Sequence, residues 1–123
     1  MKLSIDYNTS RYTINSYEAG LIKVNNQSYE KSLLISAESL HLQWQPGHVD
    51  DLDESHIDFI LELKPEIILL GTGKQLKFPD QRLITRALTQ GVGFEVMDTG
   101  AACRTYNVLS AEDRNVVAAL IIG

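Results

Sequence analysis

Three short apolar runs in the second half of the chain constrain its fold more than any other feature. They cover residues 66–70, 92–97 and 116–122. The first run is continuously apolar, which is typical of strands that are covered on both faces, as in parallel sheets. Residues 92–97 are expected to form a second central strand, and residues 116–122 a third apolar strand. Segments with helical character separate the runs. The order of strand, helix, strand, helix and strand therefore predicts an α/β domain with a parallel or mixed sheet.

The helix before the first run follows an acidic turn at residues 48–54 and is expected to reach about Lys64. Three residues compete as its N-cap: Asp51, Asp53 and Ser55. The next helix is expected to open at Pro79 and Asp80, because proline suits a first helical turn. It is expected to end at Gly91, because glycine suits the left-handed residue that closes a helix.

Residues 98–114 are expected to form a short helix and a turn between the second and third runs. Asp98 or Thr99 is suited to cap its start, and Asn107 suits a left-handed residue at its end. The connection from Asn107 to Asn115 is short for a complete crossover. We therefore expect the last strand to run antiparallel.

The first part of the chain, residues 3–36, has the character of β-structure. Two asparagines at residues 25–26 are expected to make a hairpin turn, because asparagine tolerates positive φ better than most residues. Leu33 and Ile35 should share one face of a strand, with Leu34 on the other. The fold class predicted is a three-layer α/β fold, with a central mixed sheet, helices and an additional N-terminal β-hairpin layer.

Length and charge limit the classes of function. At 123 residues the chain fits one domain. It carries 11 basic and 16 acidic side chains, a net charge of −5. General nucleic-acid binding needs a basic face, so this balance opposes it. The single cysteine cannot form an internal disulfide, and the first residues lack the apolar core of a signal peptide. We therefore expect a cytoplasmic protein without membrane insertion.

Two loops are expected to meet at one end of the sheet, because ligands of open α/β sheets collect outside the carboxyl ends of parallel strands. One loop holds Gly71, Thr72, Gly73 and Lys74, and the other holds Asp98, Thr99 and Gly100. Glycines allow backbone N–H groups to approach an anion. The spacing matches neither a P-loop nor the GxGxxG pattern, which would need glycine where Leu76 stands. A tight strand exit is therefore favoured over an anion site.

Cys103 lies in the first turns of the third expected helix, beside Arg104. A helix N-terminus and a cation both favour a reactive thiolate. No histidine is close in sequence to act as a base, although one could approach in space: His41, His48 or His56. Lone cysteines are usually buried as small hydrophobes, so an inert cysteine is favoured. Tyr106 is expected to pack in the core with its hydroxyl bonded at the rim.

Two segments, residues 71–73 and 99–107, carry a family resemblance. The second, Thr-Gly-Ala-Ala-Cys-Arg-Thr-Tyr-Asn, is the more specific. With the apolar run at residues 117–121, they resemble the MTH-like domain family, in its uncharacterised bacterial branch. That family includes mitochondrial respiratory complex I assembly factor 3 and the adipogenesis-associated MTH-like protein. The resemblance covers nearly the whole chain. It implies a three-layer α/β fold and no catalytic residues, and the mitochondrial member implies an assembly partner of other proteins.

The first functional hypothesis is a non-enzymatic protein-binding or assembly module, related to a respiratory complex. It rests on the resemblance and on the lack of a complete catalytic constellation. No cofactor or metal is expected, because the three histidines lack metal-ligand spacing, and self-association through the N-terminal β region stays open. The candidate binding surface consists of the two loops and the helix that follows: Gly71, Thr72, Gly73, Lys74, Asp98, Thr99, Gly100, Cys103, Arg104 and Asn107.

Two alternatives remain open. The main one is a small-molecule or anion site, or an enzyme, at the same place. Its pocket would be formed by Thr72, Gly73, Lys74, Thr99 and Cys103. The weaker one is local contact with nucleic acid through a basic group, which the net charge opposes. That group is Lys74, Lys77, Arg82 and Arg86.

Overall fold

The computed structural model describes residues 11–18 and 20–122 of the chain. Its centre is a mixed five-stranded sheet in the order β5-β4-β8-β6-β7. In that order the strands are Leu40–His41, Leu33–Ile35, Val116–Leu120, Ile67–Gly71 and Gly93–Met97. Strand β6 runs parallel to both β7 and β8, whereas β4 runs antiparallel to β8 and β5.

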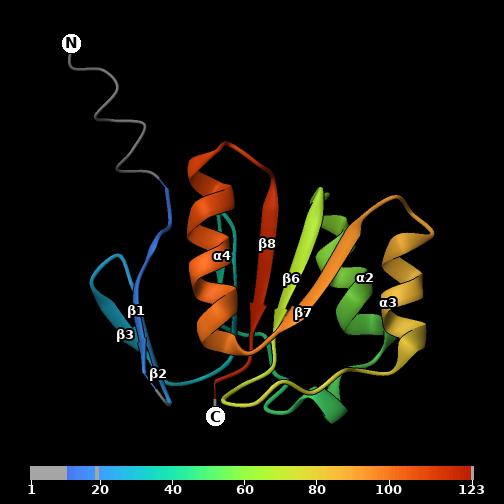
Figure 1. Ribbon diagram of the computed structural model, residues 1–123, viewed down its shortest axis with the longest axis horizontal. Coiled ribbons are helices and arrows are strands. Elements are labelled where there is room, and N and C mark those ends of the chain that lie inside the picture. Colours follow the sequence, from blue (N-terminus) through green and yellow to red (C-terminus); the bar gives the residue numbers. More distant parts are fainter. Residues whose placement is uncertain (1–10, 19, 123) are drawn as a thin grey trace.

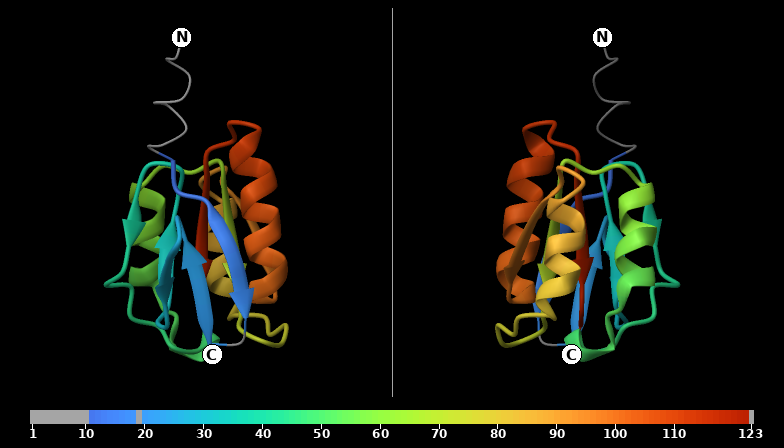
Figure 2. Two further views of the ribbon diagram at one scale, coloured as in Figure 1. Left: turned by 90° about the vertical axis from the view of Figure 1, so that its left-hand side faces the viewer. Right: turned by 90° about the vertical axis from the view of Figure 1, so that its right-hand side faces the viewer.

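Helices cover both faces of this sheet (Figure 1). Helices α2 (Glu54–Glu62) and α3 (Gln81–Leu88) lie on one face, and α4 (Thr99–Ala111) lies on the other, as the side views in Figure 2 show. A short 3₁₀ helix, η1 (Val49–Asp51), precedes α2. Asp53 caps α2 by accepting the N–H groups of Ser55 and His56. Of the three competing N-caps for this helix, the structure therefore selects Asp53.

The N-terminal part of the described chain forms a second, antiparallel sheet of three strands beside α4. Its strands are β1 (Ile14–Glu18), β2 (Leu21–Val24) and β3 (Gln27–Tyr29). Asn25 and Asn26 connect β2 to β3 with φ values of 47° and 70°. The expected asparagine hairpin turn is therefore confirmed. The part of the expected β region at residues 3–10 lies outside the described residues.

The alternation of side chains along the strands produces two cores, one on each face of the central sheet. Leu34 packs with Ile68 and Leu70 under α2 and α3. Its neighbours Leu33 and Ile35 face the opposite way and pack under α4 and the N-terminal sheet. The prediction that Leu33 and Ile35 share one face of the strand and Leu34 lies on the other is thus confirmed. Successive side chains of a strand point to opposite faces.

Two expectations about the end of the chain were wrong. The last strand, β8, runs parallel to β6 instead of antiparallel. The reason is that α4 is not a short helix followed by a turn, but continues for 13 residues to Ala111 and itself makes the crossover. Asn107 is therefore not a left-handed residue at a helix end, because it lies inside α4.

Helix α2, which was expected to reach about Lys64, ends two residues earlier, at Glu62. Lys64 has a positive φ of 57°.

Candidate functional site

The carboxyl ends of β6 and β7 bring the two expected loops together. We name residues 72–80 the β6–α3 loop and residues 97–99 the β7–α4 junction. The backbone N–H of Thr72 donates to the carbonyl of Met97 at 2.9 Å, and the N–H of Thr99 donates to the carbonyl of Gly73 at 2.9 Å. The parallel pairing of the two strands sets both contacts, since it places their carboxyl ends at one edge of the sheet.

The Thr99 hydroxyl is the central polar group of this edge. It donates to the carbonyl of Ile121 at 2.6 Å and accepts the N–H of Gly73 at 2.7 Å. Thr99 is fully buried, at 0% exposure. A single side chain therefore ties the start of α4 to the β6–α3 loop and to the segment after β8. These bonds also occupy the N–H of Gly73, which an anion site in this loop would need.

The glycines of this edge allow close packing. A Cβ atom on Gly71 would lie 3.0 Å from both Cα and Oγ1 of Thr99, and 3.1 Å from Cβ of Ala102. Gly71 therefore lets α4 approach β6 closely, which is a structural reason for the residue. At Gly100, the ring of Tyr17 lies 3.5 Å from the position that a Cβ would take. Strand β1 thus covers the first turn of α4.

Cys103 is buried beneath the N-terminal sheet at 4% exposure. Burial raises the pKa of the Cys103 thiol to about 12, and the smaller effect of neighbouring Arg104 does not offset this. A thiol with such a pKa is protonated at neutral pH and is a poor nucleophile. The structure confirms that Cys103 is buried, and its low reactivity stays a prediction.

Tyr106 and Asn107 attach the N-terminal sheet to α4. The Tyr106 side chain is fully buried, and its hydroxyl donates to the carbonyl of Tyr12 at 2.7 Å, as expected for a core tyrosine bonded at its rim. The Asn107 amide bonds both backbone groups of Ile14: its Oδ1 accepts the N–H at 3.0 Å and its Nδ2 donates to the carbonyl at 2.7 Å. Tyr106 and Asn107 therefore have an architectural role.

The β6–α3 loop presents a different surface. The Thr72 hydroxyl donates to the carbonyl of Gln75 at 2.6 Å and accepts the N–H of Lys77 at 3.2 Å, which folds the loop back on itself. Leu76 and Phe78 are 55% and 63% exposed. Sequence reasoning did not select these two residues, because an irregular loop has no periodicity that separates exposed from buried apolar side chains.

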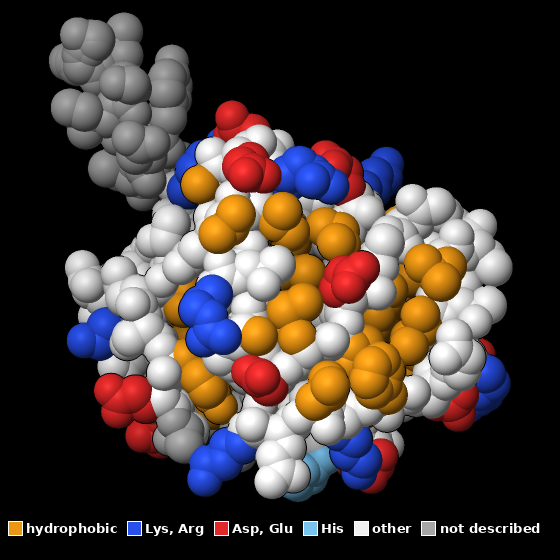
Figure 3. All heavy atoms as spheres, viewed as in Figure 1, with side chains coloured by type: hydrophobic (Ala, Val, Ile, Leu, Met, Phe, Trp, Pro, Cys, Tyr) orange, Lys and Arg blue, Asp and Glu red, His pale blue; other side chains and the backbone are white. Residues whose placement is uncertain are grey.

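Two long cations of the candidate surface remain exposed, namely Lys74 and Arg104. The Arg104 guanidinium lies 3.6 Å from the position of a Cβ on Gly100, so it folds back over the first turn of α4. Apolar side chains reach the surface near the lower end of the molecule in Figure 3, with lysine or arginine side chains beside them. In Figure 1 the β6–α3 loop and the start of α4 lie at this end.

Three of the four cations considered for nucleic-acid contact face carboxylates instead. Lys77 Nζ lies 2.7 Å from Asp50 Oδ2. Arg82 pairs with Asp80 at 3.3 Å, and Arg86 makes two bonds to Asp58, at 2.6 and 3.0 Å. These acids neutralise most of the basic group, which reduces its attraction for phosphates.

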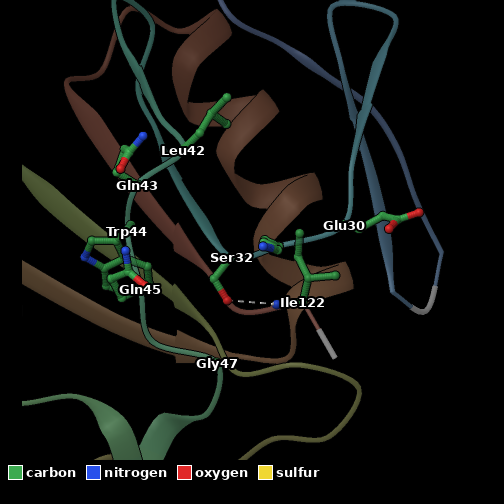
Figure 4. A pocket seen from close by; sticks show the side chains of 9 residues that line it. Glu30, Ser32, Leu42, Gln43, Trp44, Gln45, Gly47 and Ile122 are labelled. Carbon is green, nitrogen blue, oxygen red and sulfur yellow. Dashed lines mark hydrogen bonds between the residues drawn. The ribbon is translucent and has the colours of Figure 1, made fainter.

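A hollow near the end of the chain has a volume of about 390 Å³ (Figure 4). Ser32, Gln43 and Gln45 contribute polar atoms to its wall, and Ile122 contributes an apolar side chain. The Ser32 hydroxyl accepts the N–H of Ile122 at 3.4 Å, which fixes this end of the chain against the start of β4. The hollow does not include the candidate surface.

The described residues contain neither a metal-binding cluster nor a membrane-spanning helix. Among residues 11–18 and 20–122, no three His, Cys, Asp or Glu side chains are placed to hold a metal ion. In the same ranges, no helix is long and apolar enough to cross a membrane.

Comparison with known proteins identifies relatives of two kinds. A Francisella tularensis protein named "13 kDa major membrane protein" is 35% identical over 85% of this chain and 86% of that protein. The NADH dehydrogenase (ubiquinone) 1 alpha subcomplex assembly factor 3 of Danio rerio is 35% identical over 65% of this chain. The match spans only 47% of that assembly factor, a little less than half of its length.

A solved structure and a family match establish the fold and the family. The solution structure of a Bordetella pertussis protein described as an Mth938-like domain has a TM-score of 0.81 and 30% identity, covering 98% of this chain and 92% of that one. This finding confirms the resemblance to the MTH-like domain family and the predicted α/β class. Residues 14–121 match the family described as proteins of unknown function DUF498/DUF598. The chain therefore belongs to the DUF498/DUF598 family.

Proposed function

We propose that the chain is a non-enzymatic protein-binding module of the assembly-factor type, with its docking site at the carboxyl edge of β6 and β7. The observation that carries this proposal is the exposure of Leu76 and Phe78 on a loop that is held by internal hydrogen bonds. Exposed large apolar side chains on a constrained loop favour binding, because little conformational entropy is lost on association.

The proposed docking surface consists of the exposed side chains at this edge: Lys74, Leu76, Phe78 and Arg104. Two buried residues of the candidate surface support it from below. Thr72 folds the loop and Thr99 anchors it to α4, and both are buried. A surface with two apolar groups and two cations is suited to a partner surface that has an apolar pocket and acidic groups around it.

The relatives support the choice of a protein as the partner. The proteins that share this domain include assembly factors of NADH dehydrogenase, so we propose that the partner is another protein chain, and that respiratory complex subunits are the first to test. The match spans less than half of those factors. A cytoplasmic location is part of the proposal, and cell fractionation tests it against the membrane location that the name of the Francisella relative gives.

The experiment is affinity purification of the tagged full chain from its own cells, followed by mass spectrometry. The loop variant carries Leu76→Ser and Phe78→Ser. A matched control carries Leu88→Ser and Val108→Ser, which change two similarly exposed apolar side chains on α3 and α4. We expect recovery of a specific partner with the wild type and the control, and a loss of about tenfold or more with the loop variant, as for residues that dominate an interface.

Charge reversal provides an independent test of the same surface. Arg104→Glu should also lower recovery of the partner, because it reverses the charge that α4 contributes to the proposed docking surface. The urea-unfolding midpoints of both variants should stay close to that of the wild type, since all the changed side chains are exposed. Undiminished recovery with a folded loop variant would contradict the proposed docking site.

A further inference from the structure

The two edges of the central sheet differ in how they are protected. At one edge, β5 is only two residues long. At the other edge, β7 pairs with β6 over all five of its residues, without a bulge. A long, regular edge strand can accept a further strand, so proteins usually shorten, bulge or cover such edges. The edge formed by β7 is neither short nor bulged.

The edges of the N-terminal sheet are better protected than β7. Strand β3 has three residues, and β1 has a bulge between Ile14 and Ser16. The Asn107 amide also bonds both backbone groups of Ile14 from α4. Among residues 11–18 and 20–122, β7 is therefore the longest edge strand with regular pairing.

The hydrogen bonds of β7 show which of its backbone groups point outward. The N–H of Gly93 donates to a carbonyl just before β6, and the carbonyl of Met97 accepts an N–H just after β6, each at 2.9 Å. Alternate residues of a strand bond the same neighbour, so the residue midway between these two also bonds β6. The N–H and carbonyl groups of Phe94 and Val96 therefore point away from β6.

Within the described chain, these outward groups have no partner strand, because β7 is the terminal strand of its sheet. The right-hand view in Figure 2 shows β7 between α4 and α3, with no strand beyond it. We name this side of β7 the open flank. It consists of the backbone of Phe94 and Val96 and the side chain of Glu95. Backbone groups need hydrogen-bond partners, so those of the open flank bond water and can exchange it for an added strand.

The side chains of β7 determine what an added strand should carry. Phe94 and Val96 face α3, where Ile84 packs against the same core. Glu95 lies on the opposite face of the sheet and is exposed. None of the salt bridges among the described residues includes Glu95. Apolar side chains on the α3 face and a cation on the other face would complement the open flank.

A second copy of the chain would oppose like charges at the open flank. Antiparallel pairing of two β7 strands through their outward groups places Phe94 opposite Val96, and therefore places the two Glu95 side chains opposite each other. Like charges directly opposite each other destabilise a strand pair. We infer that the open flank binds an extended segment of another protein, in which a lysine or arginine lies opposite Glu95 and apolar residues flank it.

Two peptides that differ at one residue test this inference. One is Ser-Thr-Val-Lys-Val-Thr-Ser, acetylated and amidated, and the other has glutamate in place of lysine. The full chain is titrated with each peptide at low ionic strength and followed by NMR. With the lysine peptide, we expect saturating shifts and slower hydrogen exchange of the Phe94 and Val96 amides. The glutamate peptide should bind about fivefold more weakly, because it places like charges opposite each other.

Three variants separate the contributions of charge and backbone. Glu95→Lys should reverse the preference between the peptides, and the fold should be retained because Glu95 is exposed. Glu38→Lys is the matched control, since it makes the same change of charge on an exposed residue between β4 and β5. It should leave the preference unchanged. Val96→Pro removes an outward N–H and no bond to β6, so both peptides should bind about fivefold more weakly.

Three outcomes would overturn the inference. The first is no saturating shift of the Phe94 and Val96 amides at millimolar peptide concentration. The second is equal binding of the two peptides to the wild type, or an unchanged preference in Glu95→Lys. The third is protection of both amides that grows with protein concentration without peptide, which would assign the open flank to a second copy of the chain.

The inference goes beyond the proposed docking surface and does not depend on it. Leu76 and Phe78 lie in the β6–α3 loop, outside β7. The peptide titration does not test them, and the loop variant leaves the open flank unchanged. The two proposals can therefore fail separately.

Discussion

The β6–α3 loop and the β7–α4 junction leave adjacent parallel strands at the same edge of the sheet, but they use their polar groups differently. At the junction, the Thr99 hydroxyl bonds the carbonyl of Ile121 and the N–H of Gly73, so it joins three segments that are far apart in sequence. In the loop, the Thr72 hydroxyl bonds only Gln75 and Lys77, which belong to the same loop.

This difference separates a structural region from a candidate binding region. The junction is closed, because its backbone groups are paired within the chain and Thr99 is inaccessible. The loop is held in one shape, but it turns Leu76 and Phe78 outward. A substitution at the junction should therefore change the stability of the whole domain. A substitution in the loop should change binding more than stability.

The largest effect is expected for Thr99→Val, which keeps the shape of the side chain and removes its hydroxyl. The N–H of Gly73 and the carbonyl of Ile121 would both lose a partner in a buried place. Since each such loss costs about 1–3 kcal/mol, we expect the free energy of unfolding to fall by about 2–5 kcal/mol. Urea unfolding followed by circular dichroism measures this change.

Thr85→Val is the matched control for this prediction. Thr85 lies on the exposed side of α3, so the same chemical change there should alter the free energy of unfolding by about 0.5 kcal/mol or less. If Thr99→Val were as mild as Thr85→Val, the junction would not hold the edge together, and its contrast with the loop would disappear.

The sequence was sufficient to predict what local patterns determine. The apolar runs at β6 and β8 indicated buried strands, and the asparagine pair indicated the turn between β2 and β3. The direction of β8 was not predictable in the same way, because it depends on where α4 ends. Asn107 suits a helix end by its intrinsic preference, but inside α4 its amide bonds Ile14, 93 positions away. A tertiary contact overrides the local preference there.

The candidate site was predictable only as a location. The rule that parallel strands expose their carboxyl ends at one edge correctly placed Thr72 and Thr99 close together. The rule does not say whether a polar side chain at that edge faces a ligand or the chain itself. Thr99 resembles a binding residue in sequence, yet both of its hydrogen bonds are internal. Leu76 and Phe78 had no distinguishing pattern, because exposure in a loop depends on the fold around it.

A smaller effect on stability, but a large one on binding, is expected for Thr72→Val. The change removes two bonds that shape the β6–α3 loop and leaves the junction intact. The free energy of unfolding should fall by about 1 kcal/mol, as urea unfolding measures. Partner recovery in affinity purification should fall by more than this small loss of stability explains, since Leu76 and Phe78 would lose their fixed positions.

The Thr85→Val protein is again the reference for Thr72→Val, now in both measurements. A loss of stability as large as that of Thr99→Val, with unchanged partner recovery, would reverse the roles of loop and junction. In that event the binding site would have to be sought on another face of the domain.

The smallest effect concerns the far end of the loop, where Asp80 caps α3. Its carboxylate accepts hydrogen bonds from the backbone N–H and from the guanidinium of Arg82, the first of which has the larger effect. These bonds lower the pKa of Asp80 below the ordinary aspartate value of 3.8. A carboxyl group whose pKa is lower in the folded state than in the unfolded state stabilises the fold at pH values above its unfolded-state pKa. That stabilisation is lost as the pH falls through its folded-state pKa.

Asp80→Asn tests whether this cap holds the end of the loop in solution. Asparagine caps a helix about as well as aspartate but does not titrate, so the urea midpoint should be nearly unchanged at about pH 7. The loss of stability from about pH 5 to about pH 2 should be smaller than in the wild type. It should not vanish, because Asp53, Asp58 and Glu66 also have lowered pKa values. An identical loss in both proteins would mean that the cap is open, and that the loop is held only at its Thr72 end.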